Sequence, residues 1–205
     1  MRRLPLLLLP LCSTFAAADR LIDIPIARKV PVGEFRLDAQ LEASRVRSDR
    51  FFLATGINQN FDIEFRSERT SPDARVATFD IGYNFQPPIT DLAPGLSVGV
   101  QDALDLTKEG RRAYAVVTYR QGVADETVNS FIDTTIGIRV GKHTFPFIGV
   151  DLPIDGQIHG LVEHNGERIS AGLEARIMPT FKVRFLWQEH DTILSAQYSI
   201  RLKGF

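Results

Sequence analysis

Apolar and polar residues alternate over short stretches along most of this chain. The clearest stretch is residues 181–189. Its apolar positions are Phe181, Val183, Phe185 and Trp187, and the positions between them are Lys182, Arg184, Leu186 and Gln188. Because a β-strand points successive side chains to opposite faces, one face of this segment is apolar and the other is cationic and polar, apart from Leu186.

The same period of two recurs from one end of the chain to the other. It is regular in residues 34–46, 61–66, 77–85, 132–140, 169–177 and 194–203, and less regular in residues 51–57, 96–104, 113–119, 145–152 and 157–163. Turn-forming clusters of Asn, Asp, Gly and Pro separate these segments. The pattern predicts about twelve β-strands joined mostly by hairpins, several of them near the roughly 9–11 residues with which a tilted strand crosses a bilayer.

Two all-β architectures accept strands with one apolar face: a soluble sandwich and a membrane barrel. The polar faces here mix acidic, basic, amide, hydroxyl and glycine positions. This mixture favours a narrow lumen in which opposite charges pair and glycines make room for long arginines. The apolar faces suit lipid. We therefore predict an all-β transmembrane antiparallel meander β-barrel of about twelve strands, with a soluble periplasmic β-protein that binds a lipid or sugar as the alternative.

The amino terminus has the three parts of a secretory signal peptide. Two arginines follow Met1, residues 4–11 are a short apolar core, and residues 16–18 are alanines. We predict a cleaved signal peptide at residues 1–18, an N-terminal periplasmic or lumenal segment at residues 19–33, and the barrel at residues 34–205. The only cysteine, Cys12, falls within the signal peptide, so the mature chain is expected to have no disulfide.

Charged residues on the polar faces are the candidates for the lumen wall. The predicted lumen-lining residues are Arg36, Asp38, Glu42, Asp62, Glu64, Arg66, Asp80, Asp133, Arg139, Glu174, Arg176, Lys182, Arg184 and Arg201. They could bind a charged sugar or ion, or simply neutralise one another. Trp187 and the tyrosines could be sugar platforms, but an interfacial girdle is the simpler interpretation.

No pattern indicates catalysis, a metal or a cofactor. The four histidines are His143, His159, His164 and His190. No two of them lie at i, i+2 on one strand face, three fall in predicted turns, and no His-x-Ser pair occurs, so we predict no catalytic, metal or cofactor site. A lipid-modifying barrel enzyme remains a further alternative. The formal net charge of −1 gives no footprint for nucleic acid.

Several short motifs resemble the barrel units of the YjbH-like family. They are the stretches 24–28 and 30–37 (IPIAR and VPVGEFRL), 94–102 (PGLSVGVQD), 146–150 (PFIGV) and 163–174 (EHNGERISAGLE). The resemblance runs through most of the chain after residue 18, as a single unit. It implies an outer-membrane barrel of the Gram-negative envelope with a role in the export or assembly of surface polysaccharide, and it carries over no catalytic residues.

The expected partners follow from this location. They are outer-membrane lipids, the barrel assembly machinery and components of polysaccharide export. An aromatic carboxyl-terminal residue is typical of chains that the assembly machinery recognises, and this chain ends at Phe205. Phe205 is out of phase with the preceding apolar positions, and a bulge at residues 203–204 would restore the phase.

Overall fold

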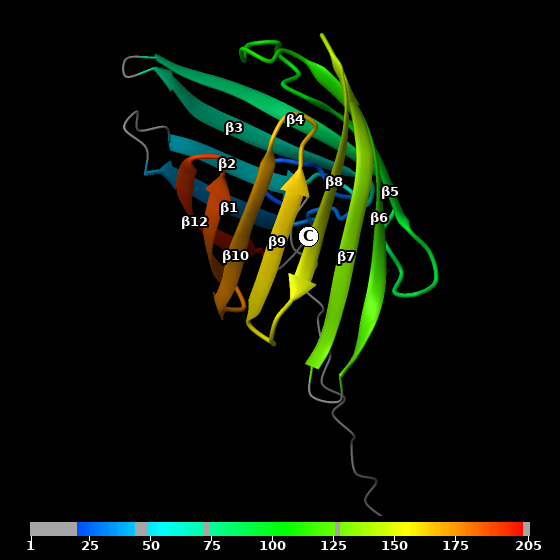
Figure 1. The fold of residues 1–205 in the computed structure, drawn as a ribbon. Helices are drawn as coiled ribbons and strands as arrows, with labels where there is room; N and C mark the ends of the chain where they lie inside the picture. Colours follow the sequence, from blue (N-terminus) through cyan, green and yellow to red (C-terminus); the bar gives the residue numbers. More distant parts are fainter. Residues whose placement is uncertain (1–19, 44–48, 72–73, 126–127, 203–205) are drawn as a thin grey trace, which may run out of the picture.

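Twelve antiparallel strands form a closed barrel in the computed structural model, which describes residues 20–43, 49–71, 74–125 and 128–202 (Figure 1). The strands are β1 (Glu34–Glu42), β2 (Asp49–Gly56), β3 (Phe61–Ser71), β4 (Ala74–Gln86), β5 (Gly95–Gln101), β6 (Arg112–Asp125), β7 (Val128–Val140), β8 (Thr144–Pro153), β9 (Ile158–His164), β10 (Ile169–Met178), β11 (Phe181–Gln188) and β12 (Asp191–Arg201).

Each strand pairs with the strands next to it in sequence, and β1 pairs with β12 to close the ring. The closing register runs from Glu34 opposite Arg201 to Glu42 opposite Ile193. Closure leaves no unpaired strand edge in the sheet. The predicted all-β, twelve-stranded meander barrel is confirmed.

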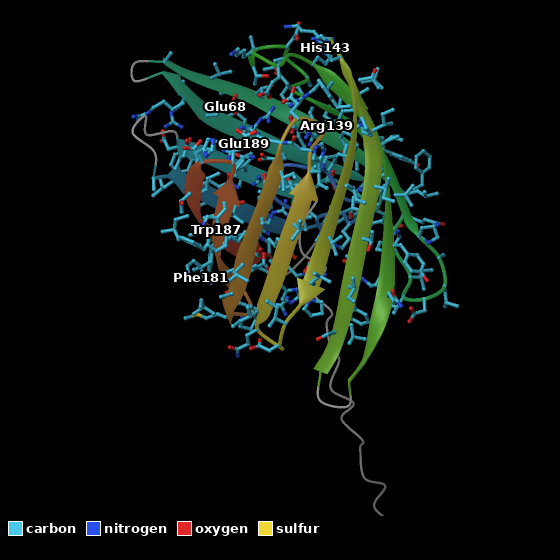
Figure 2. The ribbon with its side chains drawn as sticks, viewed as in Figure 1. Glu68, Arg139, His143, Phe181, Trp187 and Glu189 are labelled. Atoms are coloured by element: carbon cyan, nitrogen blue, oxygen red, sulfur yellow. The ribbon has the colours of Figure 1, made fainter. Side chains whose placement is uncertain are left out.

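The apolar strand faces point outward. In β11, Phe185 and Trp187 are 42% and 45% exposed, whereas Lys182, Arg184 and Leu186 are buried. Every strand carries large exposed apolar side chains on its outer face, and these surround the barrel (Figure 2). A continuous apolar belt of this extent is unfavourable in water and favourable against acyl chains.

Residues 20–33, which we call the plug, lie inside the ring of strands, where Figure 1 shows them in blue. Ile22, Ile24 and Ala27 are completely buried, and Val30 is 1% exposed. The plug contains no strand of its own and pairs with the wall through one parallel bridge between Val32 and Gly56. Its position is therefore set by side-chain contacts and not by a ladder of backbone hydrogen bonds.

Most strand ends differ from the sequence prediction: β3 continues to Ser71 and not residue 66, for example, and β6 continues to Asp125 and not residue 119. β1 ends at Glu42, and β5 ends at Gln101 because Asp102 adopts a left-handed conformation (φ 51°) that turns the chain out of the sheet. His164, expected in a turn, is the last residue of β9. The predicted signal peptide, residues 44–46 of the first segment and the carboxyl-terminal residues 203–205 lie outside the described residues.

Candidate functional site

An apolar cluster joins the plug to the inside of the barrel. Its members are Leu21, Ile22, Ile24, Ile26 and Ala27 of the plug and Val116, Phe147, Leu161, Leu186 and Ile193 of the wall. Leu186, the exception on the polar face of β11, is fully buried in this cluster. The lumen is therefore not polar throughout, as the strand pattern had suggested, because the plug supplies an apolar surface that the wall covers.

Glycines on the inner wall make room for the plug and for the aromatic ring of Tyr114. A Cβ atom at Gly149 would lie 2.6 Å from side-chain atoms of both Leu21 and Ile24, and one at Gly56 would lie 2.2 Å from the Val30 carbonyl oxygen. A Cβ atom at Gly99 would lie 2.5 Å from the hydroxyl oxygen of Tyr114. The sequence interpretation, in which such glycines accommodate arginines, was wrong at these positions. Tyr114 itself packs against the apolar cluster and so belongs to no outer girdle.

Glu163 of β9 is the main polar anchor of the plug. Its buried carboxylate accepts hydrogen bonds from the backbone N–H groups of Ile22 (2.9 Å), Asp23 (3.0 Å) and Ile24 (3.4 Å). Thr118 of β6 accepts another from the N–H of Ala27 at 2.8 Å. These contacts satisfy backbone donors that no ladder pairs, which is the requirement for irregular chain buried inside a barrel.

Ion pairs fix the two ends of the plug. Arg20 Nη2 lies 2.7 Å from Asp38 Oδ2, Arg20 Nε lies 3.3 Å from Glu64 Oε2, and the guanidinium stands 3.4 Å over the ring of Phe52. Arg28 lies 3.1 Å from Asp133. Because these pairs are largely shielded from solvent, removing one partner would leave a buried charge uncompensated.

Ion pairs within the wall neutralise further charges. Glu174 lies 2.7 Å from both Lys182 Nζ and Arg184 Nε. Arg184 also donates to the Leu21 carbonyl at 3.3 Å, and Ser195 donates to Asp38 at 2.7 Å. The wall and the plug thus share one hydrogen-bonded network.

The structure places the predicted lumen-lining residues at three levels of burial. Nine are buried inside the barrel: Arg36, Asp38, Asp62, Glu64, Asp133, Arg139, Glu174, Lys182 and Arg184. Four are partly buried: Glu42, Arg66, Asp80 and Arg176. Arg201 is exposed, because it ends β12 beyond the packed part of the lumen.

Sequence reasoning missed the residues that hold the plug. Arg20, Asp23 and Arg28 belong to a segment without periodicity, and Glu163 and Thr118 lie in strands whose alternation was irregular. A signal for them was present in the sequence: residues 20–33 are rich in charged residues and isoleucine, and a few residues on the inward strand faces, such as Leu186, are apolar. Both sets of apolar side chains need a partner that shields them from water, and each can shield the other.

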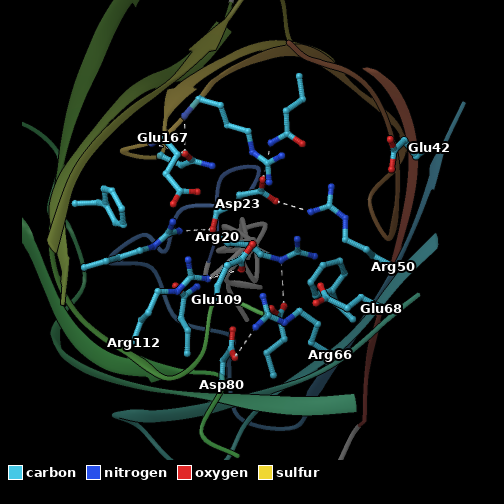
Figure 3. Close-up of a pocket in the computed structure, with 18 of the residues that line it drawn as sticks. Arg20, Asp23, Glu42, Arg50, Arg66, Glu68, Asp80, Glu109, Arg112 and Glu167 are labelled. Carbon is cyan, nitrogen blue, oxygen red and sulfur yellow. Dashed lines mark hydrogen bonds and ion pairs between the residues drawn. The ribbon is translucent and has the colours of Figure 1, made fainter. Parts of the chain in front are cut away.

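A vestibule of about 250 Å³ lies above the plug, at the barrel end where β1, β3 and β7 finish (Figure 3). Seven arginines and eight carboxylates line it. The arginines are Arg20, Arg50, Arg66, Arg69, Arg112, Arg139 and Arg168, and the carboxylates are Asp23, Glu42, Glu64, Glu68, Asp80, Glu109, Glu167 and Asp191. Arg50 pairs with Asp23 at 3.0 Å, and Arg66 lies 3.7 Å from Asp80. The vestibule is a strongly charged surface of almost balanced sign.

The loop between β5 and β6 borders this vestibule and is ordered by Asp102. Its carboxylate accepts hydrogen bonds from Thr78 Oγ1 (2.7 Å), Leu106 N (3.0 Å), Thr107 N (2.7 Å) and Thr107 Oγ1 (2.6 Å). Burial acts to raise the pKa of Asp102, but these hydrogen bonds to the ionised form outweigh it and lower the pKa to about 2.

The described residues contain no cluster of three or more His, Cys, Asp or Glu side chains placed to hold a metal ion. His159 is engaged elsewhere, with its Nδ1 2.7 Å from Asp151 Oδ1. In the same part of the chain, no helix is long and apolar enough to cross a membrane.

Comparison with known proteins identifies the fold. No family model and no curated protein sequence matches the chain. Among solved structures, a KdgM porin aligns with a TM-score of 0.57 and 10% identity, over 82% of this chain and 99% of the porin. A KdgM porin in complex with disordered oligogalacturonate aligns with a TM-score of 0.55 and 12% identity, over 82% and 99% of the two chains. At these identities the likeness concerns the fold, and the chain therefore has the fold of an outer-membrane porin-type β-barrel.

Proposed function

We propose that this chain resides in the outer membrane as a non-catalytic barrel that is closed by its own plug and assists the export or assembly of surface polysaccharide. The observation that carries the proposal is the filled lumen. Apolar packing, the three N–H donors on Glu163 and the ion pairs of Arg20 and Arg28 all hold residues 20–33 inside the strands.

The exposed apolar belt supports residence in a membrane over a soluble periplasmic protein. A soluble protein would have to cover a belt that extends over all twelve strands. The polysaccharide role rests on the YjbH-like motifs, and a likeness in fold to porins, one of them solved with an oligogalacturonate, is compatible with it.

A gated channel for saccharides is the second candidate function. Among the described residues, one isolated bridge between Val32 and Gly56 and one backbone hydrogen bond from Leu202 N to the Gly33 carbonyl join the carboxyl-terminal end of the plug to the rest of the barrel. The plug could therefore leave the lumen without breaking the strand pairing. Without the plug, the wall would enclose a passage lined mainly by charged and polar side chains, with an apolar patch where the plug had packed. The likeness in fold to a porin is compatible with this possibility.

Conductance measurements in planar bilayers test the proposal and separate the two candidates. We expect the mature protein to show no steady open channel, and a variant lacking residues 20–32 to show one. Brief openings of the unmodified protein that an added saccharide prolongs would favour the gated channel. A steady ohmic conductance of the unmodified protein, equal to that of the deletion variant, would contradict closure by the plug.

A further inference from the structure

Three charged side chains stand together on the outward face of the sheet, at the vestibule end of the barrel. They are Asp49 at the start of β2, Arg69 near the end of β3 and Arg75 near the start of β4, and we call them the rim cluster. Asp49 alternates in phase with the exposed Phe51, and Arg69 with the exposed Phe65. All other Asp, Glu, Lys and Arg side chains that the structure describes on the strands occupy inward positions. The rim cluster is therefore an exception that the apolar belt does not explain.

The rim cluster contains a pair of like charges in direct opposition. Arg69 and Arg75 face each other across β3 and β4, and like charges in such positions destabilise a sheet. Asp49 contacts both: Arg69 Nε lies 3.0 Å from Asp49 Oδ1, and Arg75 Nη2 contacts Asp49 Oδ2. Two guanidinium groups thus share one carboxylate, and within the described structure one positive charge is in excess.

The N–H donors of the two arginines are only partly used. Their side chains are 41% and 37% exposed. Asp49 Oδ1 has no hydrogen-bond partner among the described residues, so its contact with Arg69 is an ion pair without hydrogen-bond geometry. Arg75 donates to Ser67 Oγ at 3.2 Å. Further donors of both guanidinium groups remain available to an anion.

The rim cluster borders the apolar belt directly. The guanidinium of Arg75 stands 5.3 Å from the centre of the Phe51 ring, which is itself 38% exposed on the belt. Leu53 and Phe65, exposed on the same strands, continue the apolar surface away from the rim. An amphiphile could therefore place its anionic group at the arginines and its acyl chains against these side chains.

This end of the barrel faces the outer leaflet of the membrane. β1 begins and β12 ends at the opposite end, and outer-membrane barrels, which insert from the periplasm, keep the start of the first strand and the end of the last on the periplasmic side. The outer leaflet of a Gram-negative envelope consists of glycolipids whose sugar headgroups carry phosphates. Phosphate is thus the anion that lies at the height of the rim cluster.

We propose that the rim cluster binds the phosphate of an outer-leaflet glycolipid. Guanidinium groups present paired N–H donors that match phosphate oxygens, and a phosphate between Arg69 and Arg75 would compensate their like charges. The Ser67 hydroxyl is within the same group and can donate as well. An exposed ion pair with a soluble anion is worth little, whereas a lipid is held beside the site by its acyl chains, which raises its effective concentration there.

Native mass spectrometry of the detergent-purified mature protein would test this proposal with three probes. They are lipid A with its phosphates, the same lipid after enzymatic removal of the phosphates, and inorganic phosphate. We expect phosphorylated lipid A to bind at least about tenfold more tightly than either other probe, and its affinity to fall as the ammonium acetate concentration is raised.

Variants assign the binding to the rim cluster. Arg69→Gln and Arg75→Gln should each weaken the binding of phosphorylated lipid A at least about fivefold, because each removes charge-assisted hydrogen bonds. Arg111→Gln is the matched control, since it removes the same charge from an exposed residue of the loop between β5 and β6 at the same barrel end. Heat-modifiable migration checks that each variant is folded.

Asp49→Asn distinguishes a lipid site from a merely structural ion pair. Because the carboxylate competes with a phosphate for the same guanidinium groups, its removal should tighten the binding of phosphorylated lipid A severalfold. An ion pair with a structural role alone would give no such gain.

Equal binding of the phosphorylated and dephosphorylated lipids would overturn the proposal, as would inorganic phosphate bound as tightly as the lipid. Losses in Arg69→Gln and Arg75→Gln no larger than in Arg111→Gln, or weaker binding by Asp49→Asn, would also overturn it. The inference depends on the barrel lying in the outer membrane and goes beyond the proposed role in polysaccharide handling. Lipid binding is measured without conductance, so either result leaves closure by the plug to its own test.

Discussion

Single side chains decide whether the plug stays in the lumen, and Glu163 carries the largest share of its polar contacts. One carboxylate serves three consecutive N–H groups of a segment that has almost no backbone pairing of its own. Each buried donor that loses its partner costs about 1–3 kcal/mol, so this one side chain outweighs any surface ion pair of the barrel.

Replacing Glu163 by alanine should therefore loosen the plug without unfolding the barrel. We expect trypsin to cut after Arg28 or Lys29 at least about tenfold faster in Glu163→Ala than in the unmodified protein, because about 1.4 kcal/mol is a factor of ten in an opening equilibrium. Glu167→Gln, an exposed change nearby, is the control. Equal cleavage rates in Glu163→Ala and the control would show that the apolar cluster alone retains the plug.

The lowered pKa of Asp102 predicts that the stability of the loop between β5 and β6 depends on pH. Its pKa is lower in the folded protein, about 2, than its ordinary value of 3.8, so the ionised form stabilises the loop. This contribution is complete above pH of about 5 and is lost as the pH falls from about 4 through 2. Hydrogen exchange of residues 103–110 should accelerate over that interval.

The variant Asp102→Asn isolates this effect. Asparagine tolerates the left-handed backbone at this position but offers a weaker, uncharged acceptor. Exchange in the variant should already be faster at pH 7 and should lose the acid-dependent step. An acid-dependent step of the same size in the variant would assign the pH dependence to other groups.

At the level of strands, the period of two was sufficient to predict the number of strands, their antiparallel order and the face that points outward. The irregular elements were not predictable in the same way. β5 stops at Gln101 although the alternation continues, because the left-handed backbone of Asp102 and not the strand pattern ends it. Inward apolar residues such as Phe147 and Leu186 are explained by the plug, whose apolar side chains they contact. The plug segment itself has no periodicity, so its sequence does not predict where in the barrel it binds.

The outward face of β11 provides a direct test at this level. Phe185 is 42% exposed on the apolar belt, near the middle of its strand. Placing a cation there costs about 2–4 kcal/mol at a bilayer midplane. We expect Phe185→Arg to reduce the amount of heat-modifiable barrel in the outer-membrane fraction severalfold, and Phe185→Leu to leave it unchanged. Equal assembly of the two variants would contradict contact between this face and lipid.

The whole molecule consists of an apolar outer belt, a closed sheet, an inner network of paired charges, and a plug that shares an apolar cluster with the wall. The sequence predicts the charges of the inner wall because they alternate with the belt. Their grouping depends on the order of the strands around the ring. Arg139 and Arg168 are 29 positions apart in the sequence, yet they line the same side of the vestibule.

The most direct test of the membrane barrel is a spin-label scan along β11 in lipid vesicles. Single cysteines would replace residues 181–188 in turn, since Cys12, the one native cysteine, falls in the predicted signal peptide. Collision rates with oxygen, which dissolves in lipid, would be compared with those of a water-soluble nickel chelate. We predict that oxygen collisions alternate with a period of two, with maxima at residues 183, 185 and 187 and little nickel access there. Nickel collisions that are highest at these same residues would mean that the apolar face meets water and that the protein is not a membrane barrel.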